Sequence, residues 1–156
     1  MTGYEIGLLL HIFGALVFFG GAIVAGVVFE AARRRSRPSE IALLLGVTRT
    51  GALILMGGAL VVLVAGLWLA GEVDQWGQTW LLASLVLFVA ALLLGAVGGR
   101  RPKEARRLAA RLAEGPDEQT PELRRLLDDP LSRVANYASS ALVIAILVLM
   151  VWQPGR

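Results

Sequence analysis

Cysteine is absent from the 156-residue sequence, and histidine occurs once, as His11. The lack of cysteine excludes disulfides, thiolate metal sites and cysteine nucleophiles. The sequence also contains no Walker loop, dinucleotide-binding fingerprint, nucleophile elbow or zincin motif. No pair of carboxylates lies within an apolar stretch, so acid–base hydrolysis inside a membrane is not expected. We therefore predict no catalytic and no metal-binding residues.

Charged residues are nearly missing from four long stretches, and 56% of the chain is apolar, compared with roughly 45 to 50% in soluble domains. At about 1.5 Å per residue, each stretch is long enough to cross a hydrocarbon core of roughly 30 Å. The sequence predicts an all-α, four-transmembrane-helix, up-down bundle in which residues 1–156 form a single membrane domain. The predicted spans are about 6–29, 50–71, 79–99 and 134–152.

The basic residues predict the topology of this bundle. Fourteen of the 15 lysines and arginines lie in or beside the loops at about 30–49 and 100–133. The positive-inside rule places both loops in the cytoplasm and both termini outside. It also explains the formal net charge of +3 without a nucleic-acid partner. Four tryptophans at predicted outer span ends suggest an external aromatic belt: Trp68, Trp76, Trp80 and Trp152.

The segment 100–133 has the composition of soluble protein and predicts two short amphipathic helices. Pro102 and Thr120-Pro121 suit first helical turns, Gly115-Pro116-Asp117 is a break, and Asp129-Pro130 starts the last span. We expect the first of these helices to lie along the inner membrane surface. Its arginines suggest contact with anionic headgroups, although a solvated loop that only sets topology explains them equally simply.

His11 is the one ionisable group well inside a predicted span, which makes it a candidate functional residue. An imidazole can ligate haem iron, pass protons, or serve as a neutral, hydrogen-bonded structural residue. A bis-histidine haem site needs a second histidine, so one chain requires a methionine, a partner subunit or a symmetric dimer. Met56 and Met150 are the methionines within spans.

Glycines predict how the first two spans pack. Gly14–Val24 and Gly51–Val61 match at seven of eleven positions, including the pairs Gly20-Gly21 and Gly57-Gly58. Small residues allow helix backbones to approach closely in lipid, so we expect these spans to pack together. Homo-oligomers and membrane-protein partners are compatible with such residues. An inverted duplication of a small transporter or channel is the alternative, with Ser84, Ser139 and Ser140 as its few polar groups.

Several segments also carry a family resemblance: His11 with Gly14, Phe18 and Gly20-Gly21, then Ala65-Gly66-Leu67-Trp68-Leu69-Ala70, and finally Met150-Val151-Trp152-Gln153-Pro154-Gly155. With these segments the chain resembles a bacterial family of small four-helix predicted integral membrane proteins of unknown function. Its first span more distantly resembles the copper-resistance D family and the J-type haem-biosynthesis oxidase. Those resemblances imply a bacterial inner membrane, and copper or haem handling that uses additional polar residues in other spans. Of these residues only His11 has a counterpart in this sequence.

The leading hypothesis is a non-enzymatic structural, accessory or interaction protein of the lipid bilayer. A haem-associated or redox protein that uses His11 at an oligomer interface is the alternative.

Overall fold

The computed structural model describes residues 2–154, and these residues form six helices and no strand. The predicted all-α class is confirmed. The helices are α1 (Gly3–Arg33), α2 (Pro38–Glu72), α3 (Thr79–Gly98), α4 (Arg100–Ala113), α5 (Pro121–Leu127) and α6 (Pro130–Trp152). Gly155, the last residue of the terminal motif, lies outside the described residues, as does Arg156.

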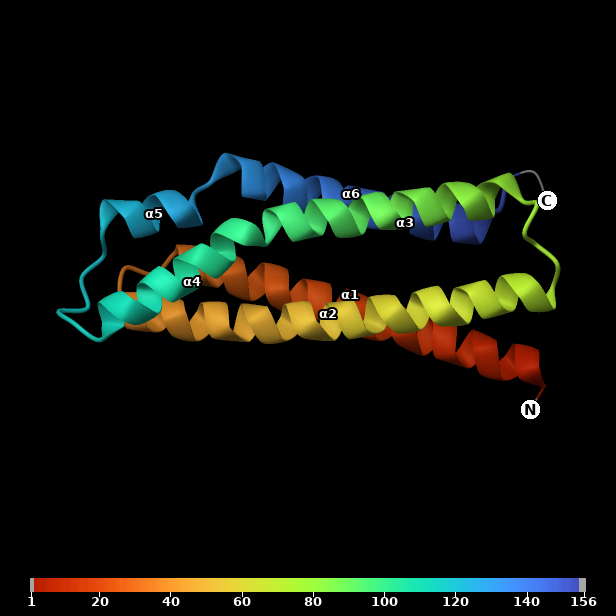
Figure 1. The fold of residues 1–156 in the computed structure, drawn as a ribbon, viewed down its shortest axis with the longest axis horizontal. Coiled ribbons are helices and arrows are strands. Elements are labelled where there is room, and N and C mark those ends of the chain that lie inside the picture. The colour runs from red at the N-terminus through yellow and green to blue at the C-terminus, as the bar shows by residue number, and fades with distance from the viewer. Residues whose placement is uncertain (1, 155–156) are drawn as a thin grey trace.

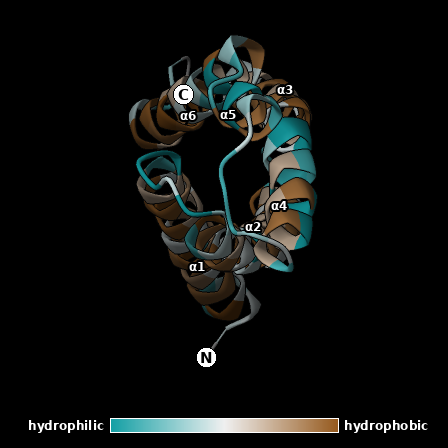
Figure 2. Ribbon diagram, turned by 90° about the vertical axis from the view of Figure 1, so that its left-hand side faces the viewer, coloured by the Kyte–Doolittle hydropathy of each residue, from teal (hydrophilic) through white to brown (hydrophobic). Residues whose placement is uncertain are grey.

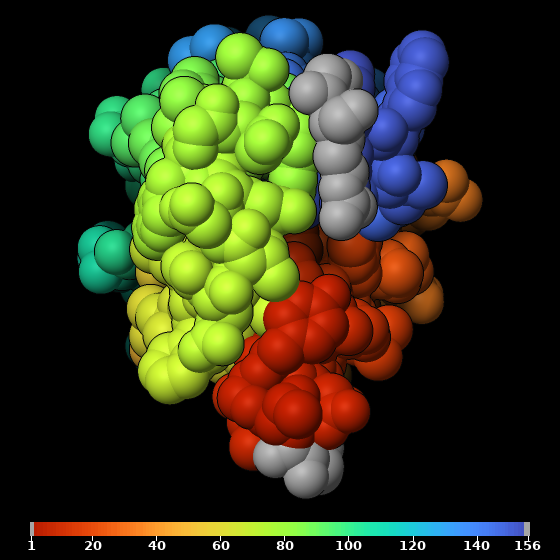
Figure 3. All heavy atoms as spheres, turned by 90° about the vertical axis from the view of Figure 1, so that its right-hand side faces the viewer, coloured from red at the N-terminus to blue at the C-terminus, as the bar shows by residue number. Residues whose placement is uncertain are grey.

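The four long helices are arranged as two antiparallel pairs. α1 packs along α2, and α3 packs along α6 (Figure 1). α4 continues from the end of α3 and slants across to pack on α2, with α5 beside it. The end of the molecule that lies opposite α4 and α5 contains three segments (Figure 3). They are the beginning of α1, the α2–α3 connection and the end of α6. Both described ends of the chain are therefore on the same side.

Each long helix has at least the roughly 20 residues needed to cross lipid, and four helical segments are long and apolar enough to do so. The hydrophobic colouring covers the long helices, whereas the hydrophilic colouring is concentrated in α4, α5 and their connections, with hydrophobic segments alternating along α4 (Figure 2). Local signals set several helix ends, and the starts predicted at Pro121 and Pro130 are confirmed. A capping box between Thr2 and Glu5 begins α1, and prolines occupy the first turns of α2, α5 and α6.

The α1–α2 interface depends on glycines spaced seven residues apart. Gly7, Gly14 and Gly21 are buried on α1, and Gly51 and Gly58 are buried on α2. A Cβ added at Gly14 would lie 2.9 Å from the Val62 backbone nitrogen, and one at Gly51 would lie 2.9 Å from that of Ala25. The predicted packing of spans one and two is confirmed. A seven-residue period is typical of helices that cross at a small angle in a left-handed sense.

Only one glycine of each adjacent pair takes part in this interface. A Cβ at Gly21 would collide with the Leu55 backbone, and one at Gly58 with the Phe18 backbone. Gly20 and Gly57 are exposed and have no neighbouring atom within 4 Å of such a Cβ. Each pair of adjacent glycines thus contains one residue that is required for packing and one that faces outward.

The α3–α6 interface uses small and polar residues in place of a glycine series. The Asn136 side chain lies directly against Gly98, where an added Cβ would have to displace the Asn136 amide group. The Ser139 hydroxyl donates to the Ala91 carbonyl oxygen across the interface at 2.8 Å. Because a hydroxyl within lipid has few alternative partners, this bond fixes the depth of α6 against α3.

One apolar cluster connects the two helix pairs, and a second connects α1 and α2 with α4 and α5. In the central cluster, Phe18, Ala59 and Phe88 meet side chains from α6 such as Val143, and the rings of Phe18 and Phe88 are 6.2 Å apart. The second cluster lies at the α4–α5 end, where residues of α1, α2, α4 and α5 are buried together. Its members are Ala32, Ile41, Leu45, Ala105, Ala109, Leu123 and Leu127.

The second cluster changes the interpretation of α4. Ala105 and Ala109 are fully buried, and Leu108 and Leu112 pack against the same cluster. The apolar face of α4 is therefore covered by α2 and α5, and the predicted contact of this face with the membrane surface is wrong. The amphipathic pattern was read correctly, but protein and not lipid covers its apolar side.

Candidate functional site

His11 lies on the face of α1 that packs against α2. Its Nδ1 is 3.0 Å from the carbonyl oxygen of Val62. A carbonyl oxygen can only accept, so Nδ1 carries a hydrogen and donates it. Gly66 makes room for the ring, since a Cβ there would lie 3.1 Å from the His11 Cε1 and Nδ1 atoms. The geometry gives His11 a clear structural contact between α1 and α2.

The other ring nitrogen of His11 remains available. Within residues 2–154, Nε2 has no hydrogen-bond partner. With the hydrogen on Nδ1, the neutral ring presents a lone pair on Nε2. Histidines that bind metals usually donate their second ring N–H to a carbonyl or carboxylate in this manner. His11 can therefore act both as a structural donor and as a ligand.

The methionines do not complete a site around His11 on one chain. Met56 is 66% exposed and precedes Gly66 by ten residues, which corresponds to about 15 Å along α2. Met150 is half-buried on α6, and no contact joins it to His11. Among the described residues, no group of three or more histidine, aspartate or glutamate side chains is placed to hold a metal ion.

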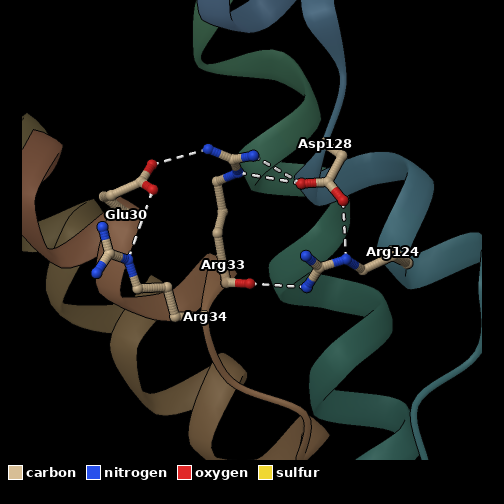
Figure 4. A network of polar contacts seen from close by, with 5 residues as sticks. All are labelled: Glu30, Arg33, Arg34, Arg124 and Asp128. Atoms are coloured by element: carbon tan, nitrogen blue, oxygen red, sulfur yellow. Dashed lines mark hydrogen bonds and ion pairs between the residues drawn. The ribbon is translucent and has the colours of Figure 1, made fainter.

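The most extensive polar network joins the end of α1 to the α5–α6 connection (Figure 4). Arg33 donates from Nη2 and Nε to one carboxylate oxygen of Asp128, at 2.7 and 3.3 Å. Its Nη1 donates to Glu30 at 2.8 Å. Arg124 pairs with the second oxygen of Asp128 at 2.8 Å and also donates to the Arg33 carbonyl oxygen. These bonds fasten segments more than 90 residues apart.

Asp128 is the electrostatic centre of this network. The Arg33 hydrogen bond, followed by the charge of Arg124, lowers the pKa of its carboxyl group against an opposing effect of desolvation. The Arg33 side chain is only 14% exposed. Its charge is therefore stabilised mainly by these acceptors, whereas the charge of a surface arginine is stabilised by water.

Glu30 pairs with arginines of its own helix and not with Arg49. Glu30 contacts Arg33 and Arg34, which follow it by three and four residues on the same helix. Arg49 is exposed and has no ion pair within the described part of the chain. It is thus free to extend toward headgroups, as its flexible stem allows.

Asp117, interpreted from the sequence only as part of a helix break, caps a distant helix. It accepts hydrogen bonds from the Ser39 backbone N–H at 2.8 Å and from the Ser39 hydroxyl at 2.7 Å. Arg37, the N-cap residue of α2, supplies no side-chain cap. The acceptor that the first turn of α2 needs therefore comes from the α4–α5 connection. The Ser39 bonds lower the pKa of the Asp117 carboxyl group.

The aromatic belt and the serines also differ from expectation. Trp68, Trp76 and Trp152 are exposed, whereas Trp80 is buried at 5% exposure, so its assignment to the belt is wrong. Ser84 donates to the Trp80 carbonyl oxygen at 2.8 Å, and Ser140 donates to that of Asn136. Ser139 likewise donates to the Ala91 carbonyl oxygen, so all three hydroxyls have acceptors on helix backbones.

The functional residues that the sequence did not reveal all act through contacts with residues far away in the chain. Asp128 and Asp117 lie in segments where cap and turn roles already explain an aspartate. Asn136 is polar at the start of an apolar helix, which is the one sequence signal that could have identified it as a packing residue.

The fold and these contacts define an all-α polytopic membrane protein with a soluble polar end. Residues 6–154 match the model of the family described as predicted integral membrane protein (DUF2269). The chain belongs to this family. No curated protein and no solved structure matches the sequence closely enough to add a relative.

Proposed function

We propose that this chain is a non-enzymatic accessory protein of the bacterial cytoplasmic membrane, with both termini outside, and that its cytoplasmic arginines hold it against anionic headgroups. The observation that carries this proposal is a layer of arginines at one depth. Arg49, Arg100 and Arg133 come from three different helices, and all are exposed. None has an ion pair with another described residue.

The depth of this layer follows from the central cluster of Phe18, Ala59, Phe88 and Val143. Arg49 precedes Ala59 by ten residues, and Arg133 precedes Val143 by ten, so each lies about 15 Å away along its helix. In the other direction, Trp68 and Trp152 follow Ala59 and Val143 by nine residues, or about 14 Å. The distance from the arginines to the tryptophans along these helices is therefore close to the roughly 30 Å of a hydrocarbon core.

This spacing supports headgroup contact at both edges. Tryptophan rings favour one interface, and arginines without protein partners favour phosphates at the other. Each basic residue near an anionic surface contributes about 1 kcal/mol. The remaining contacts of the protein, with partners or with a second copy, would be made by its exposed apolar helices.

Arg49→Gln/Arg133→Gln should reduce the enrichment of anionic lipid around the protein several-fold. The measurement is lipid analysis of polymer-extracted discs from bilayers of phosphatidylglycerol and phosphatidylcholine. Arg37→Gln/Arg125→Gln is the matched control, because it removes the same charge farther from the membrane. Equal losses in the two variants, or none in either, would contradict the proposal.

A haem-associated role for His11 is the second candidate, favoured by its Nδ1 contact with Val62, which orients Nε2 as a ligand. One chain supplies one axial nitrogen, so a symmetric pair of chains would supply two. Bound haem would provide redox chemistry, and His11 would hold the iron.

An absorption spectrum of the purified protein tests this second candidate. Haem ligation predicts a Soret band that His11→Ala abolishes, whereas Met56→Leu should leave it unchanged. A protein without visible absorption after expression with added haem would refute the haem role and leave His11 as a structural donor.

A further inference from the structure

A shallow groove lies where α3 passes into α4 beside the beginning of α6. Its volume is about 270 Å³, just below the roughly 300 to 1,000 Å³ of most ligand sites. It is therefore large enough for a headgroup but too small for a whole lipid. Its lining includes Val97, Arg100, Arg101, Glu104, Asp129 and Leu131.

The groove contains charges of both signs in equal number. Arg101 contacts Glu104 at 3.0 Å and approaches Asp129 at 3.9 Å. Asp129 accepts the Ser132 backbone N–H through Oδ2, the Ser132 side chain also interacts with its carboxyl group, and its Oδ1 makes the long contact to Arg101. Arg100 has no ion pair or hydrogen bond with another described side chain. The groove thus offers one uncommitted cation beside two carboxylates with remaining acceptor capacity.

The position of the groove favours an amphipathic ligand. Val97 follows Phe88 of the central cluster by nine residues, or about 14 Å. Arg100 lies one turn beyond, at the edge of the hydrocarbon layer. Leu131 is 66% exposed next to these charges. An apolar wall thus runs from the charged groove toward the lipid tails.

We propose that this groove binds the headgroup of phosphatidylethanolamine. The phosphate would pair with Arg100, the ammonium would donate to Asp129 and Glu104, and the acyl chains would follow Val97 and Leu131. The inference goes beyond the proposed function, because it requires only that this end of the bundle lies in a headgroup layer, on either side of the membrane.

The chemistry of the groove distinguishes ethanolamine from other headgroups. A primary ammonium has three N–H donors, whereas choline has none and depends on aromatic contacts. No aromatic side chain is among the described residues that line the groove. Phosphatidylglycerol retains a net negative charge, which two carboxylates oppose. The expected order of affinity is phosphatidylethanolamine first, followed by phosphatidylglycerol and phosphatidylcholine.

Native mass spectrometry of the detergent-purified full chain tests the proposal with three lipids that have identical dioleoyl chains. Phosphatidylethanolamine should bind about three- to tenfold more tightly than phosphatidylcholine, as expected for two partly exposed charge contacts. Asp129→Asn/Glu104→Gln should abolish this preference and retain binding of all three lipids. Asparagine at position 129 still caps α6, so the helix should persist. Arg100→Gln should weaken the binding of all three lipids by a similar factor.

The matched control is Glu114→Gln/Glu118→Gln, which removes the same charge from the α4–α5 connection and should preserve the preference. Equal binding of the choline and ethanolamine lipids would overturn the proposal. Retention of the preference in Asp129→Asn/Glu104→Gln would do so as well. Soluble glycerophosphoethanolamine, which has no acyl chains, should not displace the lipid when both are present at the same concentration. If it did, the apolar wall would contribute nothing to binding, and the assignment to a lipid would be overturned.

Discussion

Gly58→Leu should prevent the native packing of α1 against α2. A side chain at position 58 collides with the Phe18 backbone, and a backbone contact cannot be relieved by a rotamer change. Overpacking of ordinary cores costs about 1 to 3 kcal/mol, and separation of two helices should cost at least the upper end of that range. The measurement is the fraction of monodisperse protein after detergent extraction, together with its thermal unfolding midpoint.

Gly57→Leu is the control for this experiment. Position 57 is exposed, and a Cβ there meets no atom within 4 Å. The same substitution one residue away should change stability by no more than about 0.5 kcal/mol. If both variants extract and unfold alike, the glycine-dependent α1–α2 interface is incorrect.

Asp128→Ala should release the α5–α6 connection from the end of α1. The substitution removes the acceptor of two arginines and leaves Arg33, at 14% exposure, with Glu30 alone. Loss of hydrogen bonds to charged groups typically costs about 1.5 to 3 kcal/mol, and partial exposure of Asp128 favours the lower value. Faster hydrogen exchange in α5, with α2 and α3 unchanged, is the expected result. Glu118→Ala, an exposed acid with no described ion pair, should have no effect.

The pH dependence of this contact has a definite sign. Because the pKa of Asp128 is lowered in the folded protein, its contribution to stability is complete above the ordinary carboxyl pKa of 3.8 and declines as pH falls through the lowered value. Asp128→Asn should flatten that acid-side decline. Protection of α5 that falls equally in wild type and variant would assign the effect to other carboxylates.

Sequence patterns predicted the helices well because their signals are local. The apolar stretches, Pro121 and Pro130 each act on residues near them in the chain. The glycine repeat also predicted its partner, since glycines in lipid have few uses except close helix contact. The repeat did not reveal that Gly21 and Gly58 pack while Gly20 and Gly57 face outward, because helix rotation depends on the neighbouring helix.

Local sequence patterns could not predict the contacts between segments that are distant in the chain. Nothing near Asp117 indicates that Ser39 is its partner, since the two residues are 78 positions apart. Trp80 resembles the other tryptophans in its sequence environment, and the packing of α3 against the bundle determines its burial. The groove at Arg100 likewise depends on how α4 leaves α3 and how α6 begins. Each of these features required the three-dimensional arrangement.

Cysteine accessibility in spheroplasts tests the proposed topology most directly, and the cysteine-free chain permits it without prior substitutions. Gly77→Cys lies in the α2–α3 connection, and Glu118→Cys lies between α4 and α5. A membrane-impermeant maleimide should label Gly77→Cys in intact spheroplasts and Glu118→Cys only after lysis. Labelling of Glu118→Cys from outside, with Gly77→Cys protected, would place the arginine layer at the outer surface and contradict the account.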